Sequence, residues 1–178
     1  MIFEEKTLES EMIYKGKILN LRRDKVTVEN GTSYREIIEH NGGAVCAAIT
    51  DEGKIVMVRQ YRKAVERVVL EVPAGKREAD EEPLETIKRE LREETGYSAG
   101  HIELMTAMEP SVGYTAEVLY IYFATDLVPG ETDYDENEAM DVVEYDFGEI
   151  YDMVVNGEIK DAKTIIAILL AEKRLSSR

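Results

Sequence analysis

Two apolar segments separated by a short turn constrain the fold of this chain more than any other feature. Residues 44–50 read AVCAAIT, residues 54–61 read KIVMVRQY, and Asp51-Glu52-Gly53 lies between them. Strands that are apolar on both faces need cover on both faces, so they belong in the middle of a sheet. The sequence therefore predicts a central hairpin made by these two segments, with helices packed against the sheet.

Weaker strand and helix patterns surround this hairpin. Residues 13–30 and 32–40 favour a long N-terminal hairpin, because the Asn30-Gly31 pair between their strands is a preferred two-residue turn. Later segments predict strands at 67–75, 102–110 and 117–127, an acidic loop at 129–141, and helices at 144–157 and 161–175. This order predicts an α+β fold, with a small N-terminal β-strand subdomain at 1–40 and a main domain at 41–178.

The composition limits the partners of the chain. Its formal net charge is −15, which repels nucleic acid and acidic membrane surfaces, so we expect neither as a partner. Apolar residues make up 44% of the chain, enough for a proper core, and no run approaches the ~20 residues of a membrane span. The single cysteine, Cys46, lies in an apolar run, and the N-terminus lacks a signal-peptide layout. These features favour a reducing compartment, the cytoplasm.

Residues 77–97, READEEPLETIKRELREETGY, place much negative charge on one predicted helix. Pro83 suits its first turn, and Gly96 is a natural helix end. The helical period puts apolar side chains on one stripe, which should face the sheet; they are Leu84, Ile87 and Leu91.

Glu90 and Glu94 are four residues apart on this helix, so their side chains are neighbours. Like charges at this spacing repel, and a divalent cation would remove the repulsion. Mg²⁺ is usually held by one or two carboxylates together with substrate phosphates and water, so the pair suits a site that handles phosphate. A solvated helix face is the alternative interpretation, and Arg89 with Glu93 fits an ordinary ion pair.

The residues around these glutamates have a specific pattern. In order they are Gly75, Glu81, Arg89-Glu90-Leu91, Glu93-Glu94, Gly96 and Tyr97. This pattern resembles the complete signature of the Nudix hydrolases, and only Tyr97 departs from it, since an aliphatic residue is usual there. Most of the chain also resembles the ADP-ribose pyrophosphatase branch, including LEVPAGK at 70–76 and TDEGKIVMVRQYR at 50–62.

The resemblance implies a fold and an activity. The implied fold is an α/β/α sandwich around a mixed central sheet, preceded by N-terminal strands that dimerise. The implied reaction is hydrolysis of ADP-ribose, or a related nucleoside diphosphate sugar, to AMP and ribose 5-phosphate with Mg²⁺ or Mn²⁺. Two alternatives remain: a Nudix hydrolase for another compound, such as a dinucleotide, NADH or a nucleoside triphosphate, and a sensor that binds a nucleotide without cleaving it.

The same resemblance assigns metal ligands and catalytic groups by position. Glu90 and Glu94 match the principal metal ligands, and the carbonyl of Ala74 matches a backbone ligand. Glu93 matches a further ligand or base. The acidic loop resembles a segment that supplies the catalytic base in this branch. Glu136 and Glu138 both match this role, and the sequence does not decide between them.

Substrate contacts are also implied by position. Arg62 matches a residue that contacts the substrate diphosphate, and Glu117 matches a glutamate near the metal site. Glu71 is either a substrate contact or a buried, ion-paired glutamate. Val112 stands where the branch usually has a proline that marks the substrate class, so the resemblance does not fix the exact substrate.

Overall fold

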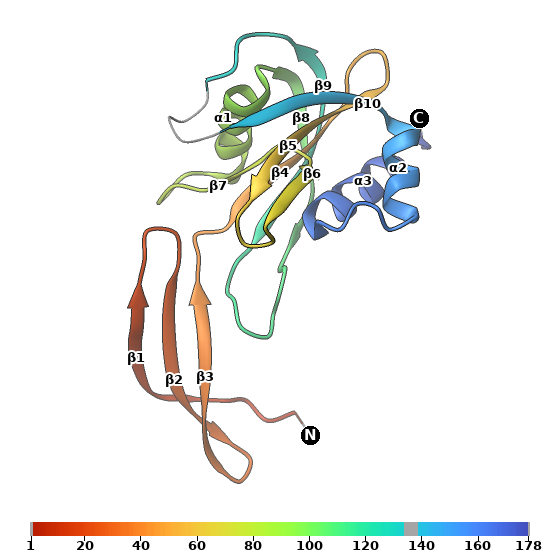
Figure 1. Cartoon of the computed structure of the whole chain (residues 1–178). Coiled ribbons are helices and arrows are strands. Elements are labelled where there is room, and N and C mark those ends of the chain that lie inside the picture. The colour runs from red at the N-terminus through yellow and green to blue at the C-terminus, as the bar shows by residue number, and fades with distance from the viewer. Residues whose placement is uncertain (1, 134–138, 178) are drawn as a thin grey trace. The chain divides into compact units, whose positions relative to one another are not determined.

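A computed structural model describes residues 2–133 and 139–177 of the chain, which divides into two compact units (Figure 1). The first unit consists of Met1–Gly42 and Glu109–Val118. The second unit consists of Gly43–Met108 and Leu119–Arg178. A segment from the middle of the sequence therefore joins the N-terminal strands in one unit.

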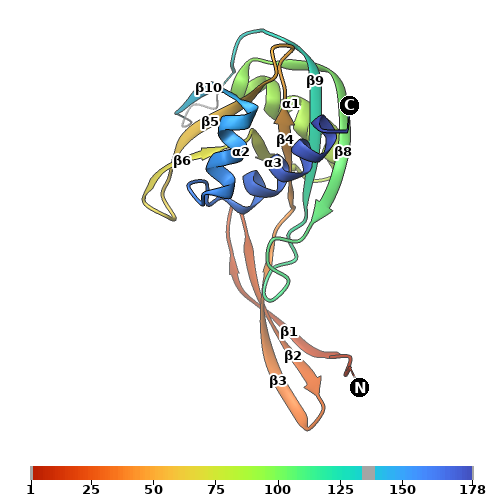
Figure 2. The same cartoon turned by 90° about the vertical axis from the view of Figure 1, so that its right-hand side faces the viewer.

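The first unit is built on a three-stranded antiparallel sheet in the order β1-β2-β3. Its strands are β1 (Thr7–Lys15), β2 (Asn20–Val28) and β3 (Gly31–Glu39), which twist strongly in Figure 2. A hairpin turn at this place was predicted correctly, but its two central residues are Glu29 and Asn30 rather than Asn30 and Gly31, because Val28 pairs with Gly31. The single strand predicted over residues 13–30 is wrong, because a turn closed by a 3.0 Å bond from the Gly16 amide to the Leu19 carbonyl separates β1 from β2.

The second unit contains two sheets. One has the order β10-β5-β6 and is antiparallel, with β5 (Lys54–Arg62), β6 (Arg67–Glu71) and β10 (Met140–Asp146). The other has the order β7-β4-β9-β8. Its strands are β4 (Gly43–Ala48), β7 (Ala74–Lys76), β8 (Ser98–Met108) and β9 (Leu119–Val128), and β4 pairs with β9 in parallel, so this sheet is mixed.

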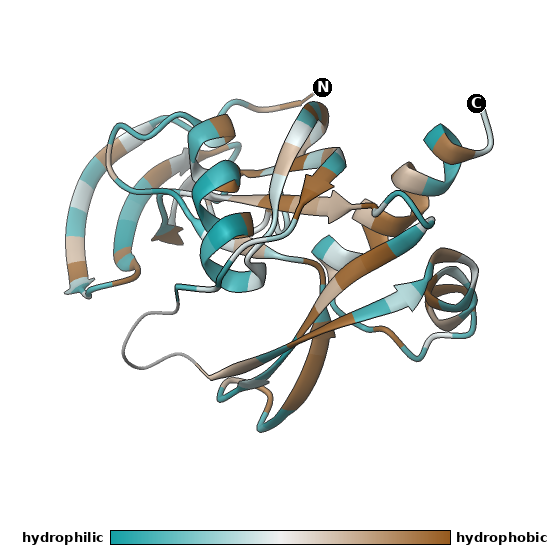
Figure 3. Cartoon of the chain, turned by 90° about the horizontal axis from the view of Figure 1, so that it is seen from above, coloured by the Kyte–Doolittle hydropathy of each residue, from teal (hydrophilic) through white to brown (hydrophobic). Residues whose placement is uncertain are grey.

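Helices cover both faces of the strands in this unit, with α1 (Pro83–Thr95) on one side and α2 (Phe147–Val155) and α3 (Ala162–Leu175) on the other (Figures 1 and 2). Alternate residues of β4 explain why. Ala44, Cys46 and Ala48 pack in the cluster of α1, whereas Val45 and Ala47 pack in the cluster of α2 and α3. Burial on both faces is what an apolar run predicts, and the central strands are largely brown in Figure 3.

Two predictions about these strands are wrong. The segments around Asp51-Glu52-Gly53 do not form a two-stranded ladder, because β4 and β5 lie in different sheets and share one isolated bridge, between Ile49 and Ile55. Strand β10 was predicted as part of a loop and a helix. Its pairing with β5 along its whole length, from Met140 to Asp146, overrides the local pattern, and α2 begins only at Phe147.

No helix among the described residues is long and apolar enough to cross a membrane.

Candidate active site

Helix α1 carries the acidic residues of the site. It runs from Pro83 to Thr95 and is capped by Gly96, which adopts a left-handed conformation (φ 76°) and donates its amide hydrogen to the Arg92 carbonyl. The predicted apolar stripe is confirmed, since Ile87 and Leu91 are fully buried and Leu84 packs against the same cluster. The stripe places the acidic side chains along its flank.

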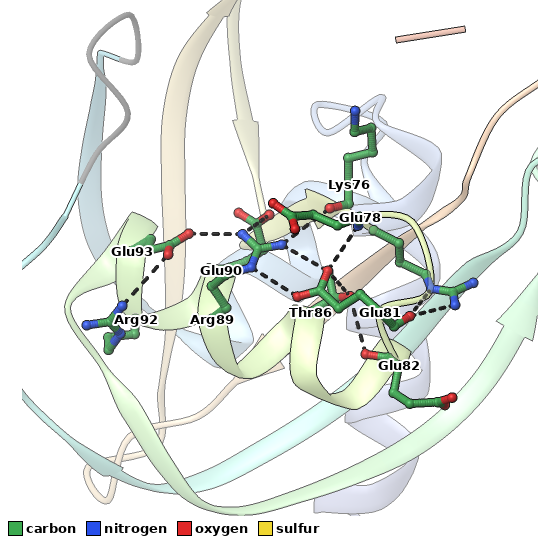
Figure 4. Close-up of polar contacts among 10 residues, drawn as sticks. Lys76, Glu78, Glu81, Glu82, Thr86, Arg89, Glu90, Arg92 and Glu93 are labelled. Carbon is green, nitrogen blue, oxygen red and sulfur yellow. Dashed lines mark hydrogen bonds and ion pairs between the residues drawn. The ribbon is translucent and has the colours of Figure 1, made fainter. Parts of the chain in front are cut away.

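Arg89 binds three glutamates at once, and it lies at the centre of Figure 4. Its Nε lies 3.1 Å from Glu81 Oε1, and its Nη1 lies 2.8 Å from Glu90 Oε1 and 3.0 Å from Glu93 Oε2. The predicted Arg89–Glu93 ion pair is therefore present. Hydrogen bonds and charge from these carboxylates outweigh partial burial and raise the pKa of Arg89, so this cation stays charged.

Glu81 fixes the loop that precedes α1. Besides Arg89, it accepts hydrogen bonds from the Glu78 amide at 3.0 Å and from the Thr86 hydroxyl at 2.8 Å. The hydrogen bond from Arg89 has the largest effect on the pKa of Glu81 and lowers it. Burial acts in the opposite direction, but the hydrogen bonds from Glu78 and Thr86 lower the pKa further, to about 2. Glu81 therefore organises the loop.

We expect Glu81→Gln to destabilise the protein by about 1–2 kcal/mol at pH 7, because it removes the charged acceptor of several hydrogen bonds. The pKa of Glu81 is depressed from 4.5 to about 2, so its stabilisation is fully present above pH 4.5 and is lost as the pH falls towards 2. Thermal unfolding of both proteins across this range measures the effect. Glu82→Gln is the control, and an equal destabilisation by both variants would contradict the assignment.

Glu90 and Glu94 lie against the backbone of β7. The Ala74 amide donates to Glu94 Oε2 at 3.0 Å, and Glu94 is buried, with 5% of its surface exposed. A Cβ added to Gly75 would overlap the carboxyl carbon of Glu90, far inside van der Waals contact. Glycine is required here because the carboxylate approaches the backbone so closely. The main chain at Ala74–Gly75 thus determines where both carboxylates lie.

This donor set suits a hard divalent cation. Glu90 and Glu94 offer carboxylate oxygens to such a cation. Ala74 on β7, whose amide contacts Glu94, offers a backbone carbonyl oxygen. Within residues 2–133 and 139–177, no three His, Cys, Asp or Glu side chains already form a metal cluster. Carboxylate and carbonyl oxygens are the donors that hard divalent cations prefer.

Comparison with known proteins identifies the family. A family profile described as the NUDIX domain matches residues 40–166, more than half of the chain. The chain belongs to the Nudix family. A second profile, described as a nucleoside diphosphate sugar hydrolase N-terminal domain, matches residues 5–35, so the resemblance extends into the N-terminal strands.

Named relatives cover nearly the whole Nudix chain. It is 42% identical over 168 residues to the ADP-ribose pyrophosphatase of Bacillus subtilis, covering 93% of this chain and 91% of that protein. It is also 42% identical over 170 residues to the methanol dehydrogenase activator of Bacillus methanolicus, covering 94% and 92%. A crystal structure of an ADP compounds hydrolase matches with a TM-score of 0.87 at 20% identity, over 99% of this chain and 97% of that one. This likeness confirms the predicted fold class.

Arg62 and Glu71, two further predicted site residues, form an ion pair with each other. Arg62 Nε and Nη2 donate to the two Glu71 oxygens at 2.7 and 2.8 Å. The hydrogen bond to Glu71 raises the pKa of Arg62. Burial would lower this pKa, but the charges of Glu71 and Glu94 raise it further. A contact between Arg62 and the substrate diphosphate stays a prediction.

Glu71 matches the buried, ion-paired interpretation of the sequence. Only 2% of its surface is exposed, and both oxygens accept hydrogen bonds. Burial alone would raise the pKa of Glu71, but the hydrogen bond from Arg62 and the charge of Lys163 outweigh it and lower the pKa. A direct contact between Glu71 and the substrate stays a prediction.

Three further predicted site residues are Glu117, Glu136 and Glu138. Glu117 belongs to the first unit, where its Oε1 lies 3.4 Å from Nδ1 of His40, and its role near a metal stays a prediction. Glu136 and Glu138 lie outside the described residues. Asp133, the last described residue before that segment, donates its amide hydrogen to the Glu93 carbonyl at 3.0 Å.

The departure at Tyr97 has a structural role. Its hydroxyl donates to Glu144 Oε1 on β10 at 2.6 Å, while its ring packs against the α1 cluster. The hydrogen bond to Glu144, with burial as the second cause, raises the pKa of Tyr97 to about 12. An aliphatic residue could not make this bond, which joins the end of the Nudix helix to β10.

Sequence reasoning missed Lys163, whose Nζ contacts Glu71. The two residues are separated by 92 positions in the chain, so no local spacing links them. The only local signal is Asp161, a good helix N-cap, because it predicts that α3 begins beside Lys163.

Proposed function

We propose that this Nudix hydrolase cleaves the diphosphate bond of nucleoside diphosphate sugars, with ADP-ribose as the first candidate substrate and AMP and ribose 5-phosphate as products. The named relative from Bacillus subtilis and the N-terminal family profile support this substrate class. The observation that carries the proposal is the placement of Glu90 and Glu94 against the Ala74–Gly75 backbone. A protein that only bound a nucleotide would not need carboxylates held in this way.

Each part of the site then has a task. Glu90, Glu94 and the Ala74 carbonyl hold the divalent ion, which we propose to be Mg²⁺ or Mn²⁺. When bound, the ion supplies positive charge that neutralises diphosphate oxygens and favours attack by water at phosphorus. Arg62 contacts the diphosphate and orients it. Glu93 is a further ligand or base.

The loop glutamates complete the proposed site. We assign to Glu136 or Glu138 the removal of the proton from the attacking water, which carries its oxygen to phosphorus as the bond to the leaving phosphate oxygen breaks. Glu117 and Glu71 are proposed substrate-binding residues. Val112 has no ring to restrict its backbone, so the loop at 111–117 does not by itself specify ADP-ribose.

A substrate panel tests the proposal. Purified protein is incubated with Mg²⁺ or Mn²⁺ and ADP-ribose, other sugar nucleotides, NADH, dinucleotides and triphosphates, and the products are identified. We expect AMP and ribose 5-phosphate from ADP-ribose, or the corresponding products from another nucleoside diphosphate sugar. Turnover of a dinucleotide or a triphosphate alone would show that the enzyme acts on that class of substrate instead. Binding without turnover of any compound would favour a nucleotide sensor.

One relative supports a second candidate function, activation of another enzyme. The relative from Bacillus methanolicus is named an activator of another enzyme and is 42% identical, equal to the pyrophosphatase from Bacillus subtilis. Identity alone therefore does not separate an activator from a metabolic hydrolase. The intact glutamates of α1 support hydrolysis in both cases, and the panel above measures it directly.

We also propose that the first unit mediates a homodimer. Strand β1 is exposed along its whole length and presents Leu8, Met12 and Tyr14, with 51%, 48% and 59% of their surfaces exposed. Apolar surface of this kind marks an interaction site in a protein. Cys46, a buried free thiol, supports a location in the reducing cytoplasm.

We expect Met12→Glu to convert the dimer to a monomer, because the new carboxylate would be buried at the interface. Within the chain, Met12 lies opposite Arg22 on β2, so the sheet itself tolerates the charge. Sedimentation equilibrium should give twice the chain mass of 20.2 kDa for the unaltered protein and once that mass for the variant. Val155→Glu, at an exposed site on α2, is the control. A monomeric unaltered protein would contradict the proposal.

A further inference from the structure

A buried carboxylate joins Arg62 of the candidate site to the beginning of α3. Glu71 binds the Nε and Nη2 atoms of Arg62, and its Oε2 also accepts a hydrogen bond from Lys163 Nζ. The Lys163 side chain is itself mostly buried, with 16% exposed. One carboxylate is therefore held between two cations, one from β5 and one from α3.

The first turn of α3 fixes Lys163 in this place. Asp161 caps the helix and accepts hydrogen bonds from the Thr164 amide at 3.1 Å and the Thr164 hydroxyl at 2.6 Å. The same Asp161 oxygen lies 2.9 Å from Lys163 Nζ. The Val72 amide, just after β6, donates to the Thr164 hydroxyl at 3.1 Å. The turn that carries Lys163 is thus bonded to the strand that carries Glu71.

This arrangement leaves one edge of Arg62 for a ligand. Glu71 takes the Nε and Nη2 edge, and within the described residues Nη1 has no hydrogen-bond acceptor. The side chain is 43% exposed and lines a cavity of about 330 Å³ together with Arg67, Lys160 and Lys163. Without Lys163, Arg62 alone would compensate the negative charge of Glu71. Most of the positive charge of Arg62 would then be neutralised within that pair and would not act on a ligand.

We propose that Lys163 is a positioning residue for substrate binding: it anchors Glu71, and Glu71 in turn holds Arg62 with its free edge and its charge directed at the diphosphate. The inference rests on the proposed function, in which Arg62 contacts the substrate. Lys163 itself touches Glu71 and Asp161 and is assigned no contact with the reacting atoms.

Steady-state kinetics of Lys163→Ala test this role. We expect KM for the nucleotide sugar to rise about tenfold while kcat stays within about twofold, because the contact of Arg62 is made in both the ground state and the transition state. Lys163→Arg, which keeps a cation, should restore most of the affinity. Lys173→Ala removes an exposed cation from the last turn of the same helix, and it should leave KM unchanged. An equal effect of both alanine variants would overturn the inference.

A double-mutant cycle separates positioning from direct contact. If Lys163 acts only through Arg62, Lys163→Ala should change KM by less than about twofold when Arg62→Met is already present. Effects on KM that multiply in the double variant would mean that Lys163 reaches the substrate independently, and they would overturn the inference. Lys163→Gln serves in the same cycle if the alanine variant does not fold.

A measurement without substrate distinguishes this inference from the proposed function. The Nε–H signal of Arg62, identified by its loss in Arg62→Met, should exchange slowly with water in the unaltered protein. We expect about tenfold faster exchange in Lys163→Ala, because Glu71 loses an anchor and water enters the space. Faster exchange without any turnover would support the link and reject the proposed function. Unchanged exchange would reject the link, whatever the turnover.

Discussion

Replacing Glu94 by glutamine is expected to lower kcat/KM by about a thousandfold, roughly 4 kcal/mol of transition-state stabilisation. The change removes a negative oxygen from the buried carboxylate that is a principal candidate ligand, and a neutral amide binds a divalent ion far more weakly. The folded structure should persist, because the amide oxygen can still accept the hydrogen bond from the Ala74 amide.

Turnover of ADP-ribose and thermal unfolding measure the two parts of this prediction. Glu85→Gln is the matched control, since Glu85 lies on the same helix but is exposed and pairs with Lys88. It should keep full activity. A Glu94→Gln protein with more than about a tenth of the normal kcat/KM would contradict the assignment of Glu94 as a metal ligand.

Gly75→Ala is expected to reduce kcat/KM by at least about a hundredfold, although it adds a single methyl group. The new Cβ would occupy the place of the Glu90 carboxyl group, so that side chain has to leave its position against β7. The glycine φ is not in the left-handed region, so displacement of Glu90, rather than backbone strain, is the cause.

Activity and divalent-ion affinity of Gly75→Ala should fall together. Gly148→Ala is the control, because an added Cβ at Gly148 meets no atom within 4 Å and alanine is favoured in a helix such as α2. Unimpaired metal binding in Gly75→Ala would show that the position of Glu90 against the backbone is not needed for the site.

Local patterns predicted the helix of the site well, because everything they needed lies within one segment. Pro83, Gly96 and the buried pair Ile87 and Leu91 are where the helical period places them. The same period did not reveal that Glu94 is buried: it only placed this glutamate beside the apolar stripe. Its burial depends on β7, which contributes the Ala74 amide from outside the helix.

The sheets were harder to predict, because strand pairing is decided between distant segments. The apolar runs of β4 and β5 correctly indicated central strands, but a run that is apolar on both faces carries no information about its neighbours. Strand β10 was missed for the same reason, since its partner β5 lies far earlier in the chain. The contacts of Lys163 with Glu71 are equally distant in sequence.

The central claim is that the carboxylates of α1 capture a divalent cation for a diphosphate substrate. Titration calorimetry with Mn²⁺ and then Mg²⁺, with and without AMP, tests it most directly. We predict saturable uptake by the unaltered protein that is abolished or greatly weakened in Glu94→Gln, while Glu85→Gln binds normally. Absence of any divalent-ion binding by the unaltered protein, even with nucleotide present, would contradict the account.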